Sequence, residues 1–127
     1  MLTLAEYLGT HGEPPESVVE NAEELLAKVN ALLLELPYPE AERPQINSGW
    51  RPAHYNATVP NAAPNSKHIT GQAVDLYDPD GVIDAHLHTH FDLLIKHRLW
   101  MEHPSATKGW CHLQSVPPRS GNLCFYP

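Results

Sequence analysis

The chain has 127 residues, of which 42% are hydrophobic and 18% charged, as in an ordinary globular protein with one domain over residues 1–127. A formal net charge of −7, with only 8 lysines and arginines, argues against nucleic-acid binding, which depends on clustered cations. No apolar run approaches the roughly 20 residues that cross a bilayer, and the acidic N-terminus does not resemble a signal peptide, so we expect neither a membrane partner nor an export signal.

The first predicted element is a helix over residues 16–36, opened by Pro14-Pro15 and ended by Pro37. Glutamates gather in its N-terminal half, where the helix dipole favours negative charge. Apolar side chains recur along it at helical spacing, at Val18, Val19, Ala22, Leu25, Leu26, Val29, Leu32 and Leu33. The acidic face is expected to be solvated.

A short strand-like run over residues 45–50 comes next, and a long loop rich in Asn, Pro and Ala follows it over residues 54–68. Long loops in compact domains are usually functional or disordered. Residues 72–78 alternate in the manner of a strand, which the turn at residues 78–81 closes.

Residues 82–98 return to helical spacing, and three short strand-like runs follow them, LWME, WCHLQSV and NLCFYP. Strands and helices in this order predict an α+β fold, a small and mostly antiparallel sheet with flanking helices.

Asp75 is the residue whose burial most needs an explanation, because an unpaired carboxylate inside an apolar strand is costly. A metal is one of few strong partners, and nine histidines in so short a chain favour metal chemistry. His68, in the preceding polar loop, and His112, in a strand-like run, could complete a site with two imidazoles and one carboxylate. The competing interpretation is that each histidine is simply packed or solvated.

Three motifs then match a known family. Residues 66–75 fit the pattern S-x-H-x-x-G-x-A-x-D, residues 110–112 read Trp-Cys-His, and residues 48–52 read Ser-Gly-Trp-Arg-Pro. Together they resemble the zinc D-alanyl-D-alanine carboxypeptidase family, which includes phage endolysins that cut the L-alanyl-D-glutamate bond and shares its fold with the hedgehog signalling domain. The resemblance covers about two-thirds of the chain, from Ile46 onward.

The resemblance implies that His68, Asp75 and His112 bind Zn²⁺, and that Arg51 faces the scissile carbonyl and stabilises the oxyanion. Without the motif, Arg51 would be interpreted as a surface residue paired with a carboxylate. Ser66 would help to shape the substrate site, although capping the loop through its hydroxyl is equally compatible with the sequence. The implied substrates are peptidoglycan stem peptides.

The chain departs from the family at Gly109, three residues before His112, where many members carry the carboxylate that acts as general base. The nearest upstream carboxylate is Glu102, which resembles the arrangement of smaller members with the base at the end of the preceding strand. We therefore expect Glu102 to act as the base, the alternative being an ordinary strand-end glutamate.

The sequence thus predicts a zinc peptidase acting on peptidoglycan, either cytoplasmic or phage-encoded and released to the wall at lysis. Whether it is a carboxypeptidase or an endopeptidase stays open. The alternatives are a catalytically silent zinc-stabilised module that binds cell-wall peptide or a protein, and a metal-free structural domain. We expect His86 and His90 to lie on a solvated helix face, Cys111 to lie in the core, and His103 to be the best further candidate near the site.

Overall fold

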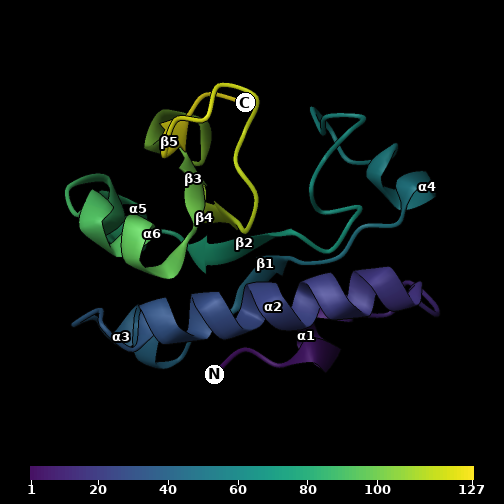
Figure 1. Cartoon of the computed structure of the whole chain (residues 1–127), viewed down its shortest axis with the longest axis horizontal. Helices are drawn as coiled ribbons and strands as arrows, with labels where there is room; N and C mark the ends of the chain where they lie inside the picture. Colours follow the sequence, from purple (N-terminus) through teal and green to yellow (C-terminus); the bar gives the residue numbers. More distant parts are fainter.

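The computed structural model describes residues 1–127 and has an α+β architecture, a five-stranded sheet with helices packed around it (Figure 1). The helical segments are α1 (Leu4–Leu8), α2 (Glu16–Leu33), α3 (Pro39–Glu42), α4 (Ala53–Asn56), α5 (Val82–His88), α6 (Phe91–His97) and the 3₁₀ turn η1 (Pro104–Ala106). The strands are β1 (Ile46–Ser48), β2 (Ala73–Asp78), β3 (Trp100–Glu102), β4 (Gly109–Gln114) and β5 (Cys124–Phe125). The predicted fold class is confirmed. None of the helices has both the length and the apolar character that crossing a bilayer requires.

The strand order in the sheet is β1-β2-β4-β3-β5, so β2 and β4 lie inside the sheet. Every neighbouring pair is antiparallel except β3 and β5, which run parallel. The register of β2 and β4 places Asp75 directly opposite His112. The two strand residues of the predicted metal site are therefore brought together by the sheet itself.

Helix α2 lies along one side of the sheet and supplies much of the core (Figure 1). Seven of its side chains are buried, at Val18, Ala22, Leu25, Leu26, Val29, Leu32 and Leu33. They repeat the helical spacing read from the sequence, so this face was predicted correctly except at Val19, which is half-buried. The helix ends at Leu33, three residues before the predicted end.

The short helix α1 was not predicted, although its start carries a recognisable signal. Thr3 and Glu6 form a capping box, in which each side chain accepts a hydrogen bond from the other residue's backbone N–H. The buried Tyr7 then ties α1 to the sheet, because its hydroxyl donates to the carbonyl of Ala73 at 2.7 Å. The backbone carbonyl of Tyr7 also accepts a hydrogen bond from the backbone N–H of Trp50 at 2.9 Å.

The single helix predicted over residues 82–98 is wrong, because the chain breaks there into α5 and α6. Thr89 lies at the break, and its hydroxyl donates to the carbonyls of Ala85 and His86 at 3.1 and 3.0 Å. Such side-chain bonds to the preceding turn compete with the continuing helix. The predicted apolar face holds only in part across the break, since Ile83, Leu87 and Leu94 are fully buried but Phe91 and Ile95 are exposed.

The long segment between β1 and β2 contains the short helix α4 and then returns to the sheet in a tight turn (Figure 1). Gly71 makes this turn with φ +80°, a conformation that glycine adopts without strain. A Cβ at this position would lie only 2.7 Å from the carbonyl oxygen of Val18 on α2. The turn therefore packs directly on α2, which fixes where the segment carrying His68 enters β2.

Candidate metal centre

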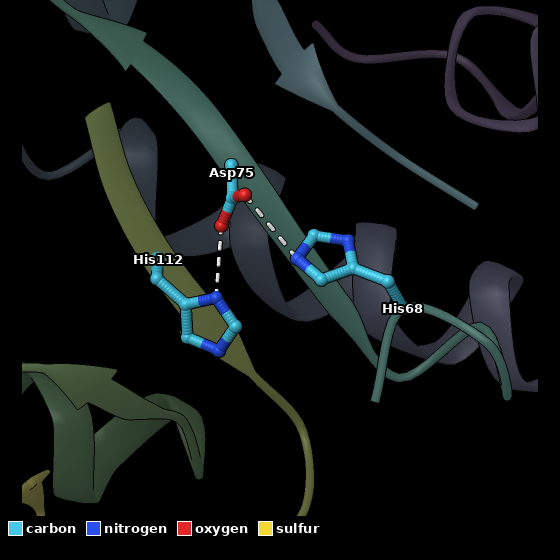
Figure 2. A group of neighbouring side chains, drawn as sticks. All are labelled: His68, Asp75 and His112. Carbon is cyan, nitrogen blue, oxygen red and sulfur yellow. Dashed lines mark hydrogen bonds and ion pairs between the residues drawn. The ribbon is translucent and has the colours of Figure 1, made fainter. Parts of the chain in front are cut away.

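His68, Asp75 and His112 converge in the structure, as Figure 2 shows, with Asp75 between the two imidazoles. His68 comes from the loop before β2, Asp75 from β2 and His112 from β4. The three residues are 1%, 7% and 5% exposed. One ligand atom from each lies within 4.8 Å of the other two. The structure thus brings together the three predicted ligands. Their spacing in the sequence does not by itself show that His68 and His112 both lie next to Asp75.

The ring of His68 is oriented by the backbone, because its Nδ1 lies 2.8 Å from the carbonyl oxygen of Gly49. A carbonyl can only accept, so Nδ1 carries the proton and Nε2 presents a lone pair. This buried Nε2 lies 3.3 Å from Asp75 Oδ2 without forming a hydrogen bond. A lone pair facing a carboxylate oxygen in a buried site is unfavourable unless a cation lies between them. The arrangement therefore fits a metal.

His112 is oriented by a side chain on its own strand, since its Nε2 lies 2.8 Å from Gln114 Oε1. The amide of Gln114 is itself fixed, because its NH₂ donates to the carbonyl of Val116 at 2.8 Å. Gln114 Oε1 is therefore an acceptor, and His112 Nε2 carries a proton. When the imidazole carries both protons, Nδ1 donates to Asp75 Oδ1 at 2.8 Å, and in the neutral ring the same nitrogen presents a lone pair that could bind a cation. Orientation of a ligand imidazole through its other nitrogen is typical of metal sites.

Asp75 is the electrostatic centre of the group. Burial alone would raise its pKa, but the hydrogen bond with His112 and the adjacent imidazole of His68 hold the pKa well below its usual range. Burial lowers the pKa of His68, whereas Asp75 and Glu102 raise the pKa of His112 despite its burial. The carboxylate is thus kept ionised in position to bind a cation.

The spacing of the donor atoms also fits a tetrahedral metal. Bonds of about 2.0 Å to a tetrahedral ion separate neighbouring ligand atoms by about 3.3 Å. Asp75 Oδ2 lies 3.3 Å from His68 Nε2, and the other oxygen, Oδ1, lies 2.8 Å from His112 Nδ1. One donor atom from each of the three residues lies within 4.8 Å of the other two, so the side chains would have to shift closer to a common centre to hold a tetrahedral ion. Two imidazoles and one carboxylate with a further open position form a typical catalytic zinc set, and ferrous iron accepts the same donors.

Arg51 lies next to these three residues, as predicted, and is 8% exposed. A terminal nitrogen of its guanidinium is 3.8 Å from Asp75 Oδ2, and its backbone N–H donates to the carbonyl of His68 at 3.1 Å. It is therefore a buried residue of the site, and the surface interpretation is wrong. The hydroxyl of Ser66 accepts from the backbone N–H of His68 at 3.2 Å. That bond confirms the capping interpretation of Ser66, which also lines the cleft described next.

A cleft of about 640 Å³ opens onto the group and is lined by Arg51, Ser66, His68, Glu102 and His112, among other residues. Glu102 ends β3, and its Oε2 lies 3.4 Å from His112 Nδ1. Burial raises the pKa of Glu102, and the neighbouring charge of His112 opposes that rise only in part. Glu102 is therefore a half-buried carboxylate facing the cleft, and the interpretation as an ordinary exposed glutamate is wrong.

No protein-family model, curated protein or solved structure matches this chain. The interpretation of the site therefore rests on the residues themselves and their geometry.

The remaining histidines are placed elsewhere. His103 follows Glu102 but does not line the cleft, and its ring stacks on Tyr126 with centroids 4.6 Å apart. His86 and His90 stack on each other at 4.0 Å, with His90 exposed and His86 half-buried, but the predicted common helix face is wrong, because α5 ends at His88 and His90 lies in the break before α6. His97 pairs with Glu35 of the segment after α2. Of these, none contacts the metal ligands.

Sequence reasoning missed the two groups that orient the ligands, Gln114 and the carbonyl of Gly49. Gln114 had a detectable signal, because residues two apart on a strand point to the same face, so it shares a face with His112. The role of Gly49 depends on a tertiary contact with His68, and nothing in the sequence indicates that contact. Cys111 points away from the ligands and is fully buried, which confirms that it belongs to the core.

Proposed function

We propose that this chain is a zinc-dependent peptidase that hydrolyses an amide bond in peptidoglycan stem peptides. The observation that carries the metal-dependent part is the unsatisfied Nε2 of His68, held by the carbonyl of Gly49 against Asp75 in a buried group that opens onto a cleft. The motif S-x-H-x-x-G-x-A-x-D supports the choice of substrate. A bound zinc ion would polarise the scissile carbonyl and acidify a water molecule.

Glu102 is the group best placed to move the proton. It lines the cleft beside His112, and burial raises its pKa, which is the direction that helps a carboxylate both to accept and to release a proton near neutral pH. It takes a proton from the attacking water and delivers it to the leaving amine nitrogen. Gly109 lines a different hollow, next to Asp84, so its lack of a side chain leaves the cleft unchanged.

Arg51 stabilises the charge that develops on the carbonyl oxygen. Its guanidinium is anchored beside Asp75 and cannot lose its proton, so it offers a fixed positive charge to the cleft. Trp110 and Phe125 also line the cleft and give apolar surface for the substrate backbone. In this proposal the cleft supplies a general base, a cation that stabilises the oxyanion, and apolar surface that contacts the substrate.

Mass spectrometry of stem peptides incubated with the protein tests the proposal. We expect a cleavage product that disappears with a zinc chelator and returns when zinc is restored, together with about one zinc per chain in the purified protein. Loss of terminal D-Ala would identify a carboxypeptidase, and an internal cut an endopeptidase. Zinc binding without any cleavage would favour the silent module. Another metal at the site, with activity that depends on it, would overturn the zinc assignment alone.

A further inference from the structure

The cleft is lined by two cationic side chains, Arg51 and Lys67, and only Arg51 lies within ion-pair distance of a carboxylate. Arg51 lies beside Asp75. Lys67 takes part in none of the ion pairs of the structure, although the chain has 15 carboxylate side chains and only 8 lysines and arginines. An unpaired cation is common on an exposed surface, but Lys67 is half-buried at a cleft wall.

The backbone of Lys67 is held in place by the turn that leads into β2. Its carbonyl accepts hydrogen bonds from the backbone N–H of Gln72 at 2.9 Å and from the hydroxyl of Thr70 at 3.2 Å. The neighbouring residue His68 is fixed in the metal group. The root of the lysine side chain therefore has a defined position relative to the ligands, and only its flexible end adapts to a bound molecule.

The other charges of the cleft do not neutralise Lys67. Among the side chains that line the cleft, Glu102 is the only carboxylate, and it lies beside His112. The remaining polar side chains of the wall include four neutral carboxamides, Asn47, Asn61, Asn65 and Gln114. Lys67 thus adds to the cleft a positive charge that no carboxylate of the structure pairs. A positive charge at the wall of a cleft attracts anionic ligands.

We infer that Lys67 binds a carboxylate of the substrate, so that the enzyme prefers peptides with a free carboxylate next to the scissile amide. This inference rests on the proposed function and specifies which stem peptides it acts on. A stem peptide carries such a carboxylate at its C-terminus or on an interior acidic residue. A lysine can bind either carboxylate, because its ammonium group is a compact charge on a flexible side chain.

Steady-state kinetics with the zinc-loaded protein distinguish the two sources. Stem peptides are compared as the free acid, as the C-terminal amide and with the interior carboxylate amidated. Amidation at the recognised position should raise KM about tenfold and leave kcat within about twofold, since a hydrogen bond to a charged group contributes about one factor of ten. Lys67→Ala should raise KM of the free acid by the same factor and abolish the difference between acid and amide.

Lys28→Ala is the matched control. It removes the same charge from α2, where Lys28 pairs with Glu24, and should leave all three peptides unchanged. Calorimetric binding of the same peptides to the Glu102→Gln variant gives a readout that does not require turnover. Equal affinity for acid and amides, or no effect of Lys67→Ala, would overturn the inference while leaving the proposed function intact. Failure of every stem peptide to bind or be cleaved would overturn both.

Discussion

Asp75 and His112 are direct partners across β2 and β4, and Asp75 Oδ1 lies 2.8 Å from His112 Nδ1. Because sheet register fixes this pair, two of the three candidate ligands are set by neighbouring strands inside the sheet. Only His68 has to be delivered by a loop, and the carbonyl of Gly49 holds its ring at 2.8 Å. The three side chains are therefore held together by the fold, which would reduce the reorganisation that binding of the proposed ion requires.

The first prediction concerns metal content. His68→Ala removes the ligand that contributes least to the sheet, so zinc should fall from about one per chain to a small fraction while the fold is kept. Elemental analysis after dialysis measures the zinc, and circular dichroism checks the fold. His54→Ala, at an exposed position on α4, is the control and should keep its zinc. Full zinc content in His68→Ala would contradict the ligand assignment.

Gln114 gives a second prediction, because it fixes His112 through Nε2 without being a ligand itself. Gln114→Leu keeps the size of the side chain but loses the acceptor, so zinc affinity should fall about 10- to 100-fold. Titration against a competing chelator measures the change. Gln45→Leu, at an exposed position, should have no effect. An unchanged affinity in Gln114→Leu would show that His112 needs no such support.

Glu102 gives a third prediction that separates catalysis from metal binding. Glu102→Gln keeps the shape of the side chain but cannot take up the proton, so kcat on a cleaved stem peptide should fall about 10²- to 10⁴-fold. Zinc content should stay unchanged, because Glu102 is not among the grouped ligands. Glu42→Gln, on the exposed end of α3, should keep full activity. Unreduced turnover in Glu102→Gln would move the role of base to another group.

The fold class could be predicted from local patterns, and the grouping of His68, Asp75 and His112 from one local signal at Asp75 together with the motifs that resemble a known family. Asp75 was an acidic residue in an apolar strand, and the α2 face repeated at helical spacing. The contacts that orient the ligands could not be predicted, since the bond from His68 to Gly49 joins residues 19 apart in the chain through tertiary packing. The break between α5 and α6 was missed because apolar spacing continues through it, while the hydroxyl of Thr89 ends the helix.

Gly71 carries a fourth prediction, on stability. Alanine there must adopt φ +80° and also place its Cβ 2.7 Å from the carbonyl oxygen of Val18. Gly81 has φ +67° with open space around it, so Gly81→Ala has the backbone strain without the clash. Gly81→Ala should lose about 1 kcal/mol of unfolding free energy, and Gly71→Ala clearly more. Urea denaturation of both variants measures this, and equal losses would show that the turn can move away from α2.

Asp84 gives a fifth prediction, on pH. It is 2% exposed, Thr107 donates to its Oδ2 at 2.5 Å, and its Oδ1 has no hydrogen-bond partner. Burial raises the pKa of Asp84, and the nearby Asp78 acts in the same direction, although the hydrogen bond from Thr107 opposes them. The folded protein therefore retains a proton at pH values where the unfolded chain, with an ordinary pKa of 3.8, has lost it.

The sign of the effect follows from this difference in proton binding. The contribution of Asp84 to stability is complete below the unfolded pKa and is lost as pH rises through the raised folded pKa. Asp84→Asn cannot ionise and lacks this loss, so its unfolding free energy relative to the unmodified protein should improve steadily from about pH 4 to about pH 7. Urea denaturation across that range measures the difference. The exposed Asp80→Asn should show no such trend, and a pH-independent difference for Asp84→Asn would mean that Asp84 is already ionised in the folded state at pH 4.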